Sequence, residues 1–400
     1  MYETIALIAA FIFLYSMTSG RLDRTIFSGA IIFTALGFIF GPLGLDVLEL
    51  NIEREGLRLL AEMTLALVLF IDASNANLGV IKKSFRIPTS LLSIGLPLTI
   101  LLGFGFGVLI FKELTLIEIA IIATILAPTD AALGKAVVTN ESVPNKIREG
   151  LSFESGLNDG ICVPILFIFL ALASHAGIEG DTASHAILLV LEEVGLGAIT
   201  GIILALIATW FLKRLRRYGW DLETWKQLKL IALAIGTFSF TQYLGGSGFI
   251  ACFVGGLLFG WLNKEEKHKL LFAAEAGADT LAMITWLIFG AVAVGHTVDQ
   301  MSWEPFVYAA LSLTIIRMGP VFLSLAGTGL NVYEKLFIGW FGPRGLASIV
   351  FAVIVLNENL PGGDTIRQVV GLTIFFSVVL HGISANPLVN TLADRLKKSE

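Results

Sequence analysis

The sequence predicts an all-α polytopic membrane protein on the strength of three observations. Hydrophobic residues make up 56% of the 400-residue chain and charged residues only 15%, whereas soluble domains carry roughly 45–50% apolar and about 25% charged residues. Apolar runs of about 20 residues, long enough to cross a bilayer as helices, recur from end to end. Short charged or Gly/Pro-rich loops separate these runs, so residues 1–400 are expected to form one membrane-embedded unit.

About thirteen transmembrane helices are expected from the apolar runs, with boundaries uncertain by about 2–4 residues. Only the division of residues 226–263 into two helices depends on a tight turn, the Gly-Gly-Ser-Gly at 245–248. The expected spans are 2–19, 25–41, 57–74, 87–111, 115–138, 148–173, 185–212, 226–244, 247–263, 270–297, 304–326, 332–357 and 366–389.

The positive charges fall in alternate loops. Segments such as 82–86 and 213–217 are rich in Lys and Arg, whereas the loops between them carry few. Because cytoplasmic loops hold the excess of Lys and Arg, the N-terminus is expected outside and the C-terminus in the cytoplasm of a cell (inner or plasma) membrane. The two cysteines, Cys162 and Cys252, lie inside apolar runs and indicate buried small side chains, so neither a disulfide nor a metal cofactor is expected.

Two of the spans contain helix breakers. Pro128 interrupts the fifth span and Pro343 the twelfth, and a proline removes a helix donor whose freed partners must be satisfied inside the protein. Broken helices that cross are therefore expected near 127–131 and 341–346. Each break is followed by one more span, which indicates two inverted repeats of six helices around an odd seventh, an architecture of secondary transporters.

The sixth span carries the polar sequence FESGLNDG at residues 153–160. Helical spacing places Glu154, Ser155, Asn158 and Asp159 on one polar stripe. A charged side chain in the middle of a membrane costs free energy, and such residues therefore usually have a function. The stripe is predicted to face the break in the fifth span.

Together the two spans offer a cage of oxygen atoms. It would consist of the carboxylates of Asp130 and Asp159, the Ser155 hydroxyl and an oxygen of Thr129, and oxygen-only cages suit hard cations. Burial and a neighbouring carboxylate also favour the protonated form of an acid. A monovalent cation and a proton would then compete for one site, and competition at a site that opens alternately to each side is coupled antiport.

Two arginines lie inside spans. Arg344 has the charge to neutralise Glu154, and we expect this pair, with Asn158 as a further partner, to join the sixth and twelfth spans. Arg317 is expected to compensate the negative ends of the half-helices where the broken spans cross. His381, in the last span, is expected to be a buried histidine whose ring nitrogens have partners.

Three motifs resemble one family over nearly the whole chain. PheGluSerGlyLeuAsnAspGly at 153–160, ProThrAspAlaAla at 128–132 and GlyProArgGly at 342–345 are similar to the signature of the NhaP/NHE-type monovalent cation:proton antiporters, in the expected order. The resemblance implies thirteen helices in an NhaA-like inverted-repeat fold, a homodimer and an elevator-like cycle. The moving core domain would comprise roughly 57–173, 270–297 and 304–389, and the dimerisation domain roughly 2–41 and 185–263.

The resemblance also implies roles for individual residues. Asp159 would be the essential carboxylate that binds the ion and the proton, and the Asn-Asp pair at 158–159 goes with electroneutral one-for-one exchange. The residues expected to help coordinate the cation are Asp130, Thr129 and Ser155. The expected supporting polar cluster consists of Glu154, Asn158 and Arg344.

The expected function is exchange of a monovalent cation, Na⁺ first and Li⁺ second, for protons. The main alternative is a K⁺/H⁺ antiporter, because oxygen-cage chemistry does not separate sodium from potassium. An intramembrane aspartyl protease would also use two membrane aspartates, but the additional ligands and paired broken helices favour transport over an enzyme. A cation channel is disfavoured because no filter loop repeats around an axis. The expected partners are the bilayer, the ions and a second copy of the chain, with no nucleic acid.

Overall fold

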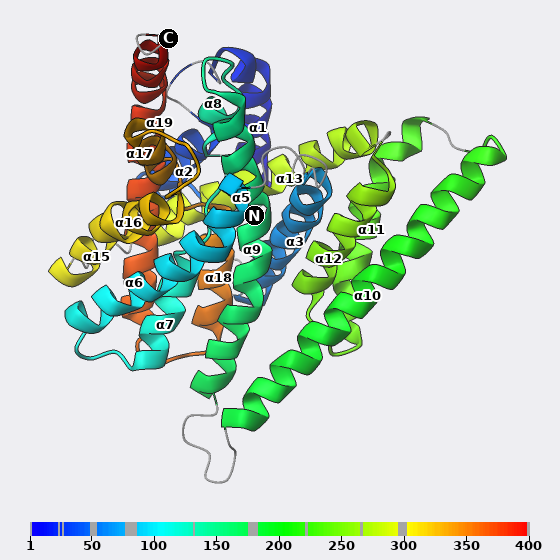
Figure 1. Cartoon of the computed structure of the whole chain (residues 1–400). Coiled ribbons are helices and arrows are strands. Elements are labelled where there is room, and N and C mark those ends of the chain that lie inside the picture. The colour runs from blue at the N-terminus through cyan, green and yellow to red at the C-terminus, as the bar shows by residue number, and fades with distance from the viewer. Residues whose placement is uncertain are drawn as a thin grey trace. The chain divides into compact units, whose positions relative to one another are not determined.

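The computed structural model describes residues 2–22, 25, 28–48, 54–76, 86–130, 133–174, 183–220, 223–264, 267–294 and 302–397. These residues form helices joined by turns and loops, with no strand among them (Figure 1). The chain divides into two compact units. The first comprises Met1–Arg58, Ser84–Asn158 and Ala282–Glu400, and the second comprises Leu59–Lys83 and Asp159–Leu281.

Within the described residues, 7 helical segments are long and apolar enough to cross a membrane. The prediction of an all-helical polytopic membrane protein is thereby confirmed. These segments are Tyr2–Leu22, Arg86–Ile110, Asn145–Ser174, Ile187–Arg217, Leu270–Val292, Trp303–Ser324 and Gly363–Arg395. Shorter apolar helices are Gly29–Phe40, Leu116–Ile125, Gly248–Leu262 and Leu346–Asn357.

The second unit is held together by close approach of helices at small residues. It contains most of α3 (Arg54–Asn75) and α13 (Lys267–Ile288), the second half of α9 (Asn145–Ser174), and α10 (Ala183–Arg217), α11 (Glu223–Tyr243) and α12 (Gly248–Leu262). A Cβ on Gly201 of α10 would overlap the backbone of α12, and a Cβ on Gly260 would overlap that of α3. Ser74 of α3 donates to the Gly256 carbonyl at 3.0 Å. Such small-residue contacts are typical of helices packed in a membrane.

The first unit contains the two broken segments. Its helices are α1 (Tyr2–Leu22), α2 (Gly29–Phe40), α5 (Arg86–Ser90), the π-helical turn η1 (Leu91–Gly95), α6 (Leu96–Ile110), α7 (Leu116–Ile125), α8 (Lys135–Val138), the first half of α9, the π-helical turn η2 (Phe289–Val294), α15 (Trp303–Leu313), α16 (Ile315–Ser324), α17 (Val332–Trp340), α18 (Leu346–Asn357) and α19 (Gly363–Lys397). The fifth expected span is thus divided into α7 and α8, and the twelfth into α17 and α18.

Both broken segments begin in the same way. Thr115 caps α7 and Asn331 caps α17, and in each case a glutamate three residues later, Glu118 or Glu334, completes a capping box. The capping box satisfies two N-terminal backbone donors at a time. Each helix then runs for 9 or 10 residues before it is broken.

Three of the described helices have 30 residues or more. The helices α9, α10 and α19 have 30, 35 and 35 residues. At 1.5 Å per residue, a helix of this length exceeds the roughly 30 Å hydrocarbon core of a bilayer. The basic residues 213–217 were expected in a loop but belong to α10. A helix can continue beyond the apolar run that crosses the membrane, because charged residues such as Lys and Arg are still good helix formers.

Glu118 also joins α7 to the loop before α19, and this contact leads to a prediction. Its side chain is buried, one oxygen accepts from the Thr115 amide at 2.9 Å, and the other accepts from the Gly362 amide at 2.6 Å. Glu118→Ala is expected to lower the free energy of unfolding by about 1–3 kcal/mol, because it leaves buried backbone donors without an acceptor. Denaturation in detergent should show this loss, while Glu358→Ala, an exposed glutamate, should show none. Equal stability of the two variants would contradict this role.

Candidate functional site

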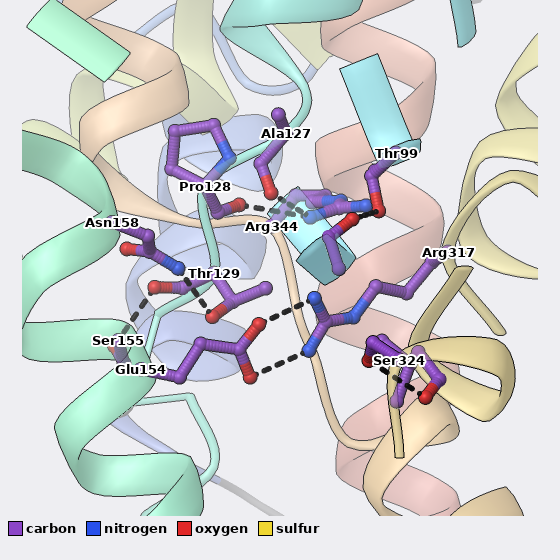
Figure 2. A network of polar contacts seen from close by, with 12 residues as sticks. Thr99, Ala127, Pro128, Thr129, Glu154, Ser155, Asn158, Arg317, Ser324 and Arg344 are labelled. Carbon is purple, nitrogen blue, oxygen red and sulfur yellow. Dashed lines mark hydrogen bonds and ion pairs between the residues drawn. The ribbon is translucent and has the colours of Figure 1, made fainter. Parts of the chain in front are cut away.

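The break in the fifth span is stabilised by an arginine. The helix α7 ends at Ile125, and residues 126–130 are not helical. The guanidinium of Arg344 donates through Nη1 to the carbonyls of Ala127, at 2.6 Å, and Pro128, at 3.0 Å (Figure 2). These carbonyls have lost their helical donors, so a buried cation at the carboxyl end of α7 supplies both hydrogen bonds and a favourable charge.

Two serines satisfy the neighbouring carbonyls of this break. Ser348 of α18 donates to the Ile125 carbonyl at 2.8 Å. Ser155 of α9 donates to the Thr129 carbonyl at 2.8 Å. The unwound chain is thus satisfied by neighbouring helices, as backbone at membrane depth must be. Residue 131, the last of the expected break, lies outside the described residues.

The break in the twelfth span is joined by hydrogen bonds to the break in the fifth span. The helix α17 ends at Trp340, and residues 341–345 are not helical. The Asp130 amide donates to the Pro343 carbonyl at 2.8 Å, while the Asp130 carboxylate accepts from the amide of Leu346, the first residue of α18, at 2.9 Å. Asp130 therefore serves as an acceptor for the positive N-terminus of α18. The two broken segments are in direct contact at their breaks.

Glu154 has a different partner from the one expected. Its carboxylate accepts from both terminal nitrogens of Arg317 at 2.6 and 2.8 Å, and both side chains are buried (Figure 2). The expected pair of Glu154 with Arg344 is therefore wrong: Arg317 neutralises Glu154, and Arg344 compensates the end of a half-helix. The pair joins α9 to α16, because a planar guanidinium matches a carboxylate in a two-point contact.

The stripe on α9 meets the fifth-span break through Asn158 as well as Ser155. The Asn158 amide donates to the Thr129 hydroxyl at 2.8 Å. The side chain of Asn158 is fully buried, and its Oδ1 has no hydrogen-bond partner within the part of the chain that the structure describes. A buried oxygen without a donor is rare and costly. This oxygen is therefore available to a cation or a water.

A small cavity lies beside these groups. It measures about 10 Å³ and is bordered by the polar residues Thr129, Asp130 and Ser155, with apolar side chains such as Leu151 completing its wall. A cavity of this size is at the lower limit for one water molecule. It can hold one small particle without its hydration shell, and its polar border provides oxygen atoms.

Asp159, the remaining member of the stripe, directly follows Asn158 on α9. Its side chain is 8% exposed, and it is the first residue of the segment Asp159–Leu281 of the second unit. The role of Asp159, like the ligand roles of Asp130, Thr129 and Ser155, stays a prediction.

Ser348 and Ser377 also contact the two breaks, although neither was expected from the sequence. Ser377 of α19 accepts from the Arg344 amide at 2.7 Å, so a second serine supports the twelfth-span break. A spacing signal was present: Ser377 and His381 are four residues apart within the last expected span, a spacing that puts two side chains on one face of a helix. As predicted, both ring nitrogens of His381 have partners.

The fold and site define a class of protein. Helices that span a membrane, two broken segments in contact at their breaks, and buried charges at those breaks are typical of secondary transporters. Residues 7–391 match the model of the transmembrane sodium/hydrogen exchanger family, and the chain belongs to this family. The family is one of transporters and not of enzymes, which confirms the predicted resemblance.

Individual relatives are distant but cover much of the chain. The K⁺/H⁺ antiporter NhaP2 of Shewanella oneidensis is 23% identical over 397 residues, which are 99% of this chain and 66% of that protein. A Na⁺/H⁺ antiporter of Schizosaccharomyces pombe is 24% identical over 71% of this chain and 67% of its own length. The chain thus spans about two thirds of the length of these relatives.

A solved structure has the same fold. The sodium proton antiporter MjNhaP1 of Methanocaldococcus jannaschii superposes with a TM-score of 0.77 at 20% identity, covering 98% of both chains. At this identity, the likeness concerns the fold and not the transported ion.

Proposed function

We propose that the protein is a monovalent cation/proton antiporter. The observation that carries the proposal is the set of buried oxygen atoms where α9 meets the fifth-span break, above all Asn158 Oδ1 and the polar border of the small cavity. Oxygen ligands suit hard cations. Membership of the sodium/hydrogen exchanger family supports the same activity.

In the proposed mechanism, Asp159 carries either the cation or the proton. Asp130, Ser155 and Thr129 complete the ion site from the fifth-span break and α9. When the cation leaves, a buried anionic carboxylate is unfavourable, so Asp159 takes a proton instead. The proposed exchange is electroneutral, one cation for one proton, because the resemblance to the antiporter family links an Asn-Asp pair such as Asn158–Asp159 with that stoichiometry.

The proposed transport cycle uses inverted repeats and an elevator-like movement. The matching capping boxes and breaks of α7 and α17 support a repeat of the same broken element. The thirteen-helix arrangement, the core domain (57–173, 270–297 and 304–389) and the dimerisation domain (2–41 and 185–263) belong to this proposal, as does the homodimer. The excess of Lys and Arg in alternate loops supports a cytoplasmic C-terminus.

Potassium is the first candidate for the transported cation. The NhaP2 relatives that match 99% of the chain are named K⁺/H⁺ antiporters, so these comparisons favour potassium over the sodium that the sequence analysis placed first. Sodium remains the second candidate, because the yeast relative and MjNhaP1 are named for it.

The test is cation-driven proton movement in proteoliposomes that contain a trapped pH dye. K⁺, Na⁺ and Li⁺ are added in turn, with and without a clamped membrane potential. A pH change driven by K⁺ and insensitive to the clamp is expected. A cation current without a pH change would indicate a channel and contradict the proposal.

Asp159→Asn should abolish the cation-driven pH change, because an amide can neither bind a proton in this range nor neutralise a cation. The matched control is Asp364→Asn, which changes an exposed aspartate at the start of α19 and should retain exchange. Thermal unfolding of both variants shows whether each has folded. Exchange retained by folded Asp159→Asn would overturn the site assignment.

A further inference from the structure

A groove runs between α17 and the last turns of α19, within the first unit, where α17 packs against both α16 and α19 (Figure 1). Its volume is about 430 Å³, and ligand sites usually measure roughly 300–1,000 Å³. One side consists of α17 residues between Tyr333 and Trp340, the other of α19 residues between Leu388 and Arg395, and Met318 of α16 completes the wall. Because a helix rises roughly 1.5 Å per residue, the groove is about 10 Å long and follows both helices for about two turns.

The inner wall of this groove is apolar, because its polar side chains have partners elsewhere. The Trp340 indole donates to Ser384 Oγ at 2.9 Å. The Thr391 hydroxyl donates to the Pro387 carbonyl at 2.8 Å, one turn back in its own helix. The wall between them consists of leucine, phenylalanine and methionine side chains. A hydrocarbon chain suits this wall, because it brings no polar group that would lose its hydrogen bonds there.

The outer end of the groove carries an exposed cation. The Arg395 guanidinium lies 3.9 Å from the centroid of the Tyr333 ring, and both residues are exposed. A guanidinium that stacks on an aromatic ring still presents its N–H groups at its edge, where they fit the oxygens of a phosphate. Arg395 is also the last residue of the candidate membrane span Gly363–Arg395. The arginine is therefore expected at the level of the lipid headgroups.

The charges near this end favour an anionic ligand. Lys335, one residue before a leucine of the groove wall, lies over the Phe322 ring of α16, 5.3 Å from its centroid. Of the neighbouring carboxylates, Glu334 is buried and paired with Lys146 at 2.8 Å, and Asp394 is exposed. With that pair neutral, the lysine and the arginine are two cations set against one anion. Basic residues at the end of a membrane span attract anionic lipids.

We propose that this groove binds an anionic phospholipid of the surrounding membrane. One acyl chain lies between α17 and α19 and reaches Trp340, while Arg395 holds the phosphate and the charge of Lys335 adds to the attraction. The two ends of the groove thus match the two ends of the lipid, hydrocarbon against the inner wall and anion against the guanidinium. A zwitterionic lipid carries an ammonium group beside its phosphate and therefore gains less from the arginine.

Quenching of Trp340 fluorescence by brominated acyl chains tests whether a chain enters the groove, without any transport assay. Bromine quenches a tryptophan only at close range, and the difference between wild type and Trp340→Phe isolates this residue from the other tryptophans. Protein in a neutral detergent is titrated with phosphatidylglycerol or phosphatidylcholine, each with brominated chains. Phosphatidylglycerol should quench Trp340 in a saturable way, with half-maximal quenching at an about tenfold lower lipid concentration than phosphatidylcholine, because it gains a charge-assisted contact.

Two results of this titration would overturn the proposal. Equal or reversed half-maximal concentrations for the two lipids would mean that the groove does not recognise an anionic headgroup. No saturable quenching by either lipid would mean that no acyl chain binds beside Trp340, as when a second copy of the chain or another protein covers the groove.

Two variants separate the headgroup contact from the chain contact. Arg395→Gln removes the cation and keeps the apolar wall, so phosphatidylglycerol should lose most of its advantage over phosphatidylcholine. Thr391→Phe extends a wall side chain into the groove and should weaken the quenching by both lipids. Each variant is compared with its own Trp340→Phe version, and thermal unfolding shows that it has folded. An unchanged lipid preference in Arg395→Gln, or unchanged quenching in Thr391→Phe, would contradict the proposed binding mode.

The matched control is Arg367→Gln, which changes an exposed arginine at the opposite end of α19. Arg367 pairs with Asp364 at 3.0 Å and lies outside the groove. The control should bind both lipids as wild type does. If Arg367→Gln loses as much preference for phosphatidylglycerol as Arg395→Gln, the lipid responds to the charge of the whole protein, and the proposed site at the groove is wrong.

Discussion

Replacing Glu154 with glutamine should lower the free energy of unfolding by about 3–5 kcal/mol, because breaking a buried ion pair leaves an uncompensated charge. The charge left behind is that of Arg317, which is 1% exposed and bound by both terminal nitrogens to the lost carboxylate. Chemical denaturation in detergent micelles measures the loss. Asp364→Asn, which breaks an exposed pair with Arg367 at 3.0 Å, should cost less than about 1 kcal/mol.

Double-mutant cycles decide which arginine is the partner. The variant Glu154→Gln/Arg317→Met should be more stable than the sum of its single changes predicts, because the second change removes the charge that the first one exposed. The corresponding cycle with Arg344→Met should show much weaker coupling, since Arg344 binds the carbonyls of Ala127 and Pro128. Strong coupling of Glu154 to Arg344 instead would support the pairing that the sequence suggested.

The two breaks could be predicted from the sequence because their cause is local. Pro128 and Pro343 each interrupt an apolar run, and no arrangement of the remaining chain restores the missing donor. The polar stripe of residues 153–160 could be predicted for the same reason, since helical spacing alone puts its members on one face. Composition and spacing were sufficient for the fold class, the breaks and the meeting of α9 with the fifth-span break.

The choice between the two arginines could not be predicted, because it depends on tertiary distances. Arg317 and Arg344 carry the same charge and both lie inside spans, so either could neutralise Glu154. A side chain's partner is set by how α16 and α17 are placed against α9, and no local rule fixes that placement. The sequence therefore identified the charged groups correctly and assigned their contacts incorrectly.

The hydrogen bond between Asp130 and the start of α18 could not be predicted for a related reason. In the sequence it is an acidic residue next to a proline in a membrane span, which indicates a cation ligand. In the structure its carboxylate also accepts from the amide of Leu346, the first residue of α18, which lies 216 positions further along the chain. One carboxylate can do both, because it has about four lone-pair positions and the helix amide uses one. Asp130 thus belongs both to the candidate site and to the contact between the two broken segments.

Gly345→Ala should have the second large effect, because it acts on this shared residue. Gly345 precedes α18 directly, and a Cβ at this position would overlap the carboxylate and the Cβ of Asp130. Alanine therefore has to displace Asp130 from the amide of Leu346. The lost hydrogen bond and the overpacking should together lower the free energy of unfolding by about 2–4 kcal/mol. Cation-driven proton movement in proteoliposomes should fall to the level of Asp159→Asn, since one predicted ligand has moved.

The matched control is Gly105→Ala in α6, where a Cβ meets no atom within 4 Å. Alanine is the better helix former at such a position, so Gly105→Ala should be as stable as wild type or slightly more stable, with normal exchange. The comparison separates the loss of a glycine in general from the loss of space beside Asp130. If Gly345→Ala keeps wild-type stability and exchange, the close contact between α18 and Asp130 does not exist in the working protein. If stability falls but exchange persists in the folded fraction, Asp130 caps α18 without binding the cation.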